Sequence, residues 1–139
     1  MRLIKTLSSL IIITILTNFA CSKNDSPYKS IRIGKESIGA TISLNVGDTL
    51  IASLRSNPTT GYSWHLMKLD TSKVDLDGFS YIQDKPALTG TGGTESFRFI
   101  TIGAGTTELG MTYARSGLTD TIPIDSFRVN LQIVHLMPD

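Results

Sequence analysis

The chain has 139 residues, of which 40% are hydrophobic and 18% charged, and its formal net charge is +1. This length suffices for one domain with a short leader, and the sequence shows no internal repeat. Lys and Arg total 13 and the acidic residues 12, so the basic excess is a single charge and we expect no nucleic-acid partner. A single cysteine excludes an internal disulfide.

The first twenty residues are predicted to be a signal peptide rather than part of the fold. Arg2 and Lys5 form a basic start, and a mostly apolar run of about 13 residues follows over residues 7–19. This run is shorter than the roughly 20 apolar residues that span a bilayer. Cys21 follows the run directly, where a lone cysteine is either a free thiol or a modified anchor.

This arrangement resembles a bacterial lipoprotein signal, in which the cysteine is lipidated and becomes the mature N-terminus. It implies a signal peptide over residues 1–20, followed by a lipidated Cys21 and a polar tether over residues 21–29. The expected location is the bacterial cell envelope, where the protein would be exported and lipid-anchored, facing the periplasm or the surface. Ordinary cleavage near Ala20, which leaves a free thiol, is the alternative.

Residues 30–139 are predicted to form one all-β domain, because apolar and polar residues alternate in one short run after another. No apolar pattern with a 3.6-residue period is sustained, and turn-forming residues separate the runs. Seven or eight strands in about 110 residues predict an Ig-like antiparallel β-sandwich. The runs contain Ile42 to Val46, Leu50 to Leu54, Trp64 to Leu69, Val74 to Ile82, Phe97 to Phe99, Leu109 to Tyr113 and Phe127 to Ile133, and the turns lie at Gly47-Asp48, Asp77-Gly78, 90–93 and 103–105.

The most restricted polar segment of the domain is Asn57-Pro58-Thr59-Thr60-Gly61-Tyr62, between two predicted strands. Pro58 fixes its own φ and favours extended backbone at Asn57. The two threonines are β-branched and stiff, and Gly61 permits a positive φ. Such a loop loses little entropy when a partner binds it, so the segment predicts a rigid binding loop rather than a plain connector. Trp64 continues into the next strand and is predicted to be a core residue.

No residue pattern indicates a catalytic or metal site. His65 and His135 have no Cys, His or carboxylate nearby at a ligand spacing, and we expect them to be packing or surface residues. Cys21 lies outside the domain, so it cannot be a nucleophile set in a pocket. Asp75 and Asp77 are expected to be solvated turn residues. We therefore predict a protein that is not an enzyme and that needs no metal or cofactor.

The glycine cluster Gly90-Thr91-Gly92-Gly93 is not a phosphate-binding loop. Such a loop needs Gly-Lys-Ser/Thr at the start of a helix, whereas Thr94-Glu95 and a predicted strand follow here. The cluster is either a flexible hairpin connection or a loop whose backbone approaches a partner closely.

Taken with their spacing, these two segments resemble the chagasin family of cysteine protease inhibitors over residues 35–136. The family's first loop, Asn-Pro-Thr-Thr-Gly and an aromatic residue, is matched in full by residues 57–62. Its glycine-rich loop is matched by Gly90, Gly92 and Gly93. Its third loop contains Tyr-x-Arg-Pro-Trp and is matched only in part, by Tyr113-Ala114-Arg115 followed by Ser116-Gly117 in place of Pro-Trp.

The resemblance implies a sandwich whose three neighbouring loops enter the cleft of a papain-like cysteine protease and block it reversibly, without being cleaved. Thr59 and Thr60 would lie over the catalytic Cys and His of the protease. Residues 90–94 would flank the cleft on one side, and residues 113–118, with Arg115 and Ser116, on the other. Because an interface Trp can be an energetic anchor, its absence predicts weaker or differently selective inhibition. The expected partner is the cell's own protease or a foreign one, bound by a monomer.

A second hypothesis is an Ig-like surface lipoprotein that binds a glycan or a protein for adhesion or assembly. The loop frame would then be scaffold geometry without a role in protease binding, and the missing Pro-Trp favours this alternative. Inhibition of papain-like proteases by the isolated domain separates the two hypotheses.

Overall fold

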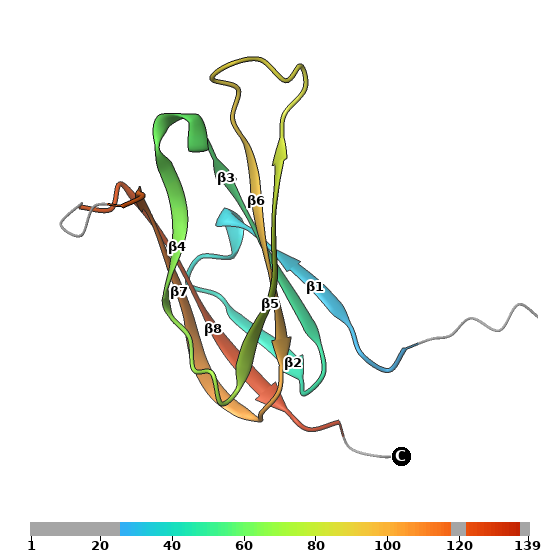
Figure 1. Cartoon of the computed structure of the whole chain (residues 1–139). Helices are drawn as coiled ribbons and strands as arrows, with labels where there is room; N and C mark the ends of the chain where they lie inside the picture. The colour runs from blue at the N-terminus through green and yellow to red at the C-terminus, as the bar shows by residue number, and fades with distance from the viewer. Residues whose placement is uncertain (1–25, 118–121, 137–139) are drawn as a thin grey trace, which may run out of the picture.

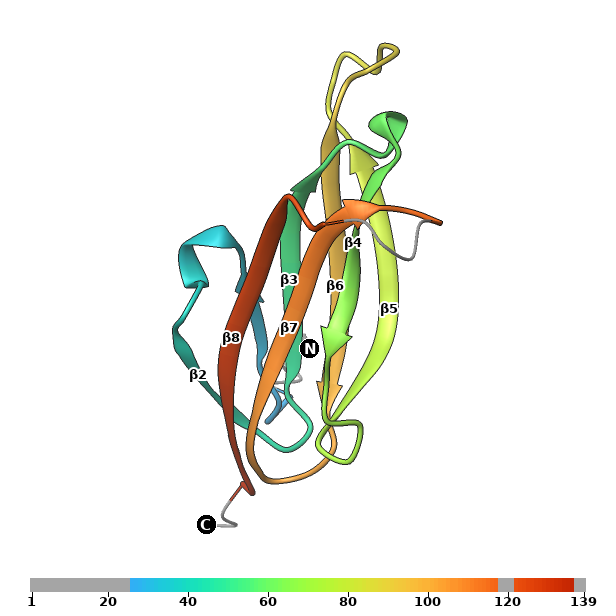
Figure 2. The same cartoon turned by 90° about the vertical axis from the view of Figure 1, so that its left-hand side faces the viewer.

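The computed structural model describes residues 26–117 and 122–136, and within them the chain forms two packed β-sheets (Figures 1 and 2). This part of the chain contains eight strands and two single-turn 3-10 helices. The strands are β1 (Ser30–Ile33), β2 (Thr41–Asn45), β3 (Thr49–Ser56), β4 (Tyr62–Lys68), β5 (Val74–Gln83), β6 (Gly93–Thr101), β7 (Gly105–Arg115) and β8 (Asp125–Val134), and the 3-10 helices are η1 (Lys35–Ser37) and η2 (Pro58–Thr60). The predicted all-β sandwich is confirmed.

The two sheets have the strand orders β1-β3-β6-β5 and β2-β8-β7-β4. Most neighbouring strands are antiparallel, as predicted, but β1 pairs with β3 and β2 pairs with β8 in parallel. The sheets are therefore mixed. The reason is the path between β1 and β2, in which the chain leaves the edge of one sheet, turns through η1 and joins the edge of the other.

The core lies between the sheets and follows from the period of two in the strand sequences. In β8, Phe127, Val129, Leu131 and Ile133 are buried while the residues between them are exposed. Successive side chains of a strand point to opposite faces, so this alternation places one apolar row against the other sheet. Trp64 is 5% exposed and packs in the same core, which confirms the prediction made for it.

Two local predictions fail in the strand β5. Asp77-Gly78 was expected to be a turn, but both residues lie inside β5, where the register against β6 shifts between Leu76 and Gly78. This is a bulge, which bends a strand without ending it. Asp75 is accordingly a strand residue, and Asp77 forms an ion pair with Arg98 of β6 rather than lying in a solvated turn.

The strand β1 was not predicted, because only four residues form it. Its pairing to β3 comes from the tertiary structure rather than from a local pattern. In the described part of the chain, no helix is long and apolar enough to cross a membrane. Residues 1–25, including Cys21, lie outside the described residues, so the predicted signal peptide, lipidation and tether boundaries stay predictions.

Candidate functional site

The strand registers bring the three predicted loop segments to one end of the sandwich. Ser56, the last residue of β3, pairs with Gly93, which also pairs with Gln83 at the end of β5. In the other sheet, Tyr62 at the start of β4 pairs with Arg115 at the end of β7. The segments after β3, β5 and β7 therefore leave the sandwich at the same end (Figures 1 and 2).

The first loop, residues 57–61, is a single turn of 3-10 helix held by its own polar groups. The N–H groups of Thr60 and Gly61 donate to the carbonyls of Asn57 (3.0 Å) and Pro58 (2.9 Å). The hydroxyls of Thr59 and Thr60 donate to the side-chain oxygen and the carbonyl of Asn57, both at 2.6 Å. Pro58 begins the turn with its fixed φ, and Gly61 ends it at φ 82°. The rigidity predicted from the sequence is built from these four bonds.

The internal bonds determine what the loop presents to solvent. Pro58, Thr59, Thr60 and Gly61 are exposed. Because each threonine donates its hydroxyl proton to Asn57, the exposed side chains offer methyl groups and acceptor oxygens rather than donors. The surface of the loop is therefore small, stiff and uncharged.

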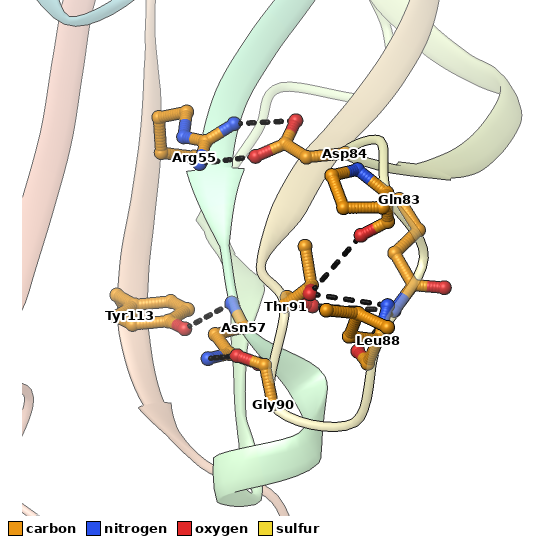
Figure 3. Close-up of polar contacts among 9 residues, drawn as sticks. Arg55, Asn57, Gln83, Asp84, Leu88, Gly90, Thr91 and Tyr113 are labelled. Carbon is orange, nitrogen blue, oxygen red and sulfur yellow. Dashed lines mark hydrogen bonds and ion pairs between the residues drawn. The ribbon is translucent and has the colours of Figure 1, made fainter.

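Asn57 attaches the first loop to its neighbours, as Figure 3 shows. Its backbone N–H donates to the hydroxyl of Tyr113 at 2.8 Å, and its side-chain amide donates to the carbonyl of Gly90 at 3.0 Å. At the other end of the loop, the N–H of Ser116 donates to the carbonyl of Gly61 at 2.9 Å. The first loop is thus bonded directly to both of the other predicted segments.

The glycine-rich segment is the second half of a longer loop, Asp84 to Gly92, between β5 and β6. The hydroxyl of Thr91 lies 3.2 Å from the N–H of Leu88 and 3.3 Å from the carbonyl of Pro86, and so closes the loop on itself. Arg55 of β3 donates two hydrogen bonds to Asp84, at 2.9 and 2.6 Å (Figure 3). These bonds lower the pKa of the Asp84 carboxyl. The loop is therefore closed internally and tied at its base to the strand that carries the first loop.

The four residues of the glycine cluster differ in exposure. Gly90 is exposed, and Thr91 and Gly92 are half-buried, whereas Gly93 is buried as the first residue of β6. A Cβ at Gly93 would lie 2.3 Å from the carbonyl oxygen of Ile82, so the fold itself requires glycine there. Of this cluster, Gly90 presents the most open backbone to a partner.

Arg115 and Ser116 are both exposed and lie beside the exit of the first loop. The guanidinium carbon of Arg115 is 5.3 Å from the centroid of the Tyr62 ring. Tyr62 in turn lies 5.7 Å from the ring of Tyr113, which is 5.2 Å from that of Trp64. A row of aromatic rings therefore leads from the core to Arg115 at the surface. Residues 118–121 lie outside the described residues.

Two residues of this region were not predicted, Ser56 and Glu95. Both are buried, and the carboxylate of Glu95 accepts hydrogen bonds from the Ser56 hydroxyl at 2.5 Å and from the Trp64 backbone N–H at 3.1 Å. The sequence did contain a signal, because Glu95 has the same parity as Phe97 and Phe99 in β6 and therefore faces the core.

The described residues contain no group of three or more His, Cys, Asp and Glu side chains that could hold a metal ion. His135 is exposed, and His65 is half-buried on β4 with its Nε2 atom unpaired. Neither histidine lies among the loop residues described above. The end of the sandwich that carries the three loop segments is therefore a preordered surface suited to binding.

Comparison with known proteins gives concordant results. The family described as Chagasin family peptidase inhibitor I42 matches residues 43–131. Chagasin from Trypanosoma cruzi is 31% identical over 107 residues, which cover 74% of this chain and 97% of that protein. Among solved structures, a cysteine protease inhibitor from Entamoeba histolytica aligns with a TM-score of 0.70 at 20% identity, covering 78% of this chain and 98% of that one. Amebosin aligns with a TM-score of 0.60 at 21% identity, covering 78% and 99%.

Proposed function

The chain belongs to the chagasin family of peptidase inhibitors, and on this premise we propose that it inhibits papain-like cysteine proteases by inserting its first loop into their active-site cleft. It is an inhibitor and not an enzyme, as its family indicates. Residues 57–62 form the inserted edge. Residues 90–93 contact one side of the cleft, and Arg115 with Ser116 contacts the other.

The observation that supports this proposal most directly is the preordered first loop. It is exposed at its tip, yet its conformation is set by four internal hydrogen bonds and by bonds to Tyr113, Gly90 and Ser116. Binding therefore costs little additional ordering, which is how a rigid loop gains affinity. The absence of charge at Thr59 and Thr60 also avoids the cost of burying an unpaired ion in the cleft.

The turn also predicts resistance to cleavage. The bonds from Thr60 to Asn57 and from Gly61 to Pro58 keep the backbone curled, unlike an extended strand. To be hydrolysed, the loop would have to break these bonds while still attached at both ends. We therefore expect reversible inhibition with no loss of intact protein.

The test is a titration of papain and several cathepsins with residues 26–139, which contain both sheets and the whole core. We expect inhibition that is reversed by dilution. The variant Thr59→Arg/Thr60→Arg should abolish it, because two long cations cannot enter a cleft shaped for two threonines. The matched control Thr71→Arg/Thr106→Arg places the same charges on exposed threonines at the opposite end and should inhibit like the wild type. The proposal fails if wild type is inactive at micromolar concentration against every protease tested.

We further propose that the protein is a lipoprotein held to the cell envelope through Cys21. The point at which the chain enters the domain suits this role. Lys29 donates its N–H to Asp48 and accepts from Thr49, both at 2.8 Å, at the start of β3. The first loop follows the end of β3, eight residues and about 25 Å away. The first loop therefore lies at the end of β3 opposite the point where the chain enters the domain (Figure 1).

Lipidation is tested in bacterial cells that express the full chain. The wild type should incorporate labelled palmitate and fractionate with membranes. Cys21→Ser should do neither, while the full-length variant keeps full inhibition, because Cys21 lies outside the predicted domain. Equal membrane association of both proteins would contradict the anchor without affecting the proposed inhibition.

A further inference from the structure

Glu95 is a buried carboxylate directly below the first loop. It is 1% exposed, and it lies on the core face of β6. One carboxylate oxygen accepts from the Ser56 hydroxyl at 2.5 Å, and the other accepts from the Trp64 backbone N–H at 3.1 Å. Glu95 takes part in none of the ion pairs among the described residues. In the described part of the chain, its carboxyl oxygens are therefore paired by hydrogen bonds rather than by an ion pair.

The two partners of Glu95 flank the first loop. Ser56 is the last residue of β3, immediately before the loop, and Trp64 lies in β4, three residues after Gly61. In a β-hairpin these two strands would pair with each other and so fix the width of the loop. Here β3 and β4 belong to different sheets, and no ladder of backbone bonds joins them. The separation of the two loop ends must be set by side chains.

Glu95 is suited to set it, because its two oxygens bond to both strands at once. A second cross-sheet bond runs from the Trp64 indole N–H to the carbonyl of Arg55, at 2.9 Å, and supports the same separation. We infer that Glu95 is a positioning residue for inhibition: it holds the ends of β3 and β4 at the distance that gives the first loop its binding shape. This inference rests on the proposed function.

The chemistry of the site predicts which substitutions preserve this role. In Glu95→Gln the amide oxygen can accept from Trp64, and the amide N–H₂ can donate to Ser56, whose hydroxyl also accepts. No cation is left unpaired. Glu95→Asp keeps the charge but is shorter by one carbon–carbon bond, about 1.5 Å, and cannot reach both partners. Glu95→Leu keeps the bulk but leaves the Trp64 N–H without a partner.

A control on the same strand separates positioning from general stability. Thr101 lies at the far end of β6, is also 1% exposed, and donates its hydroxyl to the carbonyl of Asn45 at 2.6 Å. Thr101→Val should therefore lower the stability of the domain as a buried polar change does, but it acts at the end opposite the loops. Thr101→Val should leave the inhibition constant Ki within about twofold of wild type. This is well below the tenfold change, equivalent to roughly 1.4 kcal/mol, that is expected when the loop loses its positioning.

The experiment measures Ki for papain at a temperature where every variant is folded, together with amide hydrogen exchange at Asn57 and Gly61 in the free domain. We expect Glu95→Asp and Glu95→Leu to raise Ki at least about tenfold and to speed exchange at both amides by a similar factor. Glu95→Gln should restore both to near wild type. If the Glu95→Leu variant does not fold, the comparison with wild type is made with Glu95→Asp alone.

Unchanged Ki and unchanged exchange in Glu95→Asp would overturn the inference, as would a loss in Glu95→Gln equal to that in Glu95→Leu. An equal loss in Thr101→Val would reduce Glu95 to a stability residue and would likewise overturn it. If wild type does not inhibit any protease, the proposed function fails. The exchange data then still decide whether Glu95 fixes the loop.

Discussion

The hydroxyl of Tyr113 accepts the backbone N–H of Asn57 at 2.8 Å, so a strand of one sheet holds the first residue after a strand of the other. Tyr113 belongs to β7 and Asn57 follows β3. The same tyrosine ring lies between those of Tyr62 and Trp64. One side chain therefore joins the core, the first loop and the segment that carries Arg115.

The first prediction concerns this bond. Tyr113→Phe keeps the ring and removes the acceptor, which leaves the half-buried Asn57 N–H unpaired. We expect a loss of about 1 kcal/mol in the free energy of unfolding, measured with urea, and a rise in Ki of several-fold. Tyr28→Phe is the control, because Tyr28 lies at the opposite end and is 52% exposed. A Tyr113→Phe protein with unchanged Ki would show that the bond does not orient the loop.

The second prediction concerns the backbone at the end of the first loop. Gly61 has φ 82°, and Gly39, outside the loops, has φ 77°. Gly61→Ala and Gly39→Ala should each lose about 1–2 kcal/mol of unfolding free energy, because an L-residue is strained at positive φ. Only Gly61→Ala should also weaken inhibition, since its added methyl group lies in the binding loop. Equal effects of the two variants on Ki would contradict this assignment.

The third prediction concerns Arg115, whose guanidinium lies over Tyr62 at the surface. Arg115→Ala should raise Ki about tenfold or more while leaving the melting temperature nearly unchanged, because exposed interface arginines are often energetic anchors. Arg128→Ala is the matched control, since the side chain of Arg128 is 68% exposed on the face of β8, away from the loops. Kinetic titration of papain with both variants checks the difference. The assignment is wrong if both leave Ki unchanged.

The fourth prediction concerns acid stability at the end opposite the loops. Asp70 accepts bonds from the Lys73 ammonium and from Ser72, and these lower its pKa from 3.8 to about 2. Because the pKa is lower in the folded state, the carboxylate stabilises the fold at pH values above 3.8. This contribution is lost as the pH falls toward 2. Melting temperatures of wild type and Asp70→Asn should therefore differ at pH 6 and converge near pH 2. A constant difference would contradict this account.

Much of the fold follows from local patterns. The alternation in β6, β7 and β8 predicted strands and their buried faces, since the period of two depends only on the extended backbone. The stiffness of residues 57–61 was also predictable, because Pro58, two β-branched residues and Gly61 restrict the chain before any tertiary contact forms, but the 3-10 turn itself was not predicted.

The tertiary structure decided what depends on partners distant in sequence. The parallel pairings of β1 and β2 are contacts at sheet edges, for which four- and five-residue strands carry no local signal. Asp77-Gly78 has the composition of a turn, yet pairing along β6 makes it a bulge, because the ladder on either side holds the strand together.

The same distinction between local sequence and tertiary structure holds for the end of the sandwich that carries the loops. The sequence by itself determined a stiff first loop, because stiffness is a property of the loop's own residues. Only the tertiary structure decided how far apart its ends lie and what holds them. Those constraints come from Glu95 and Tyr113, which lie some 40 and 55 residues further along the chain and reach the loop only when the two sheets pack.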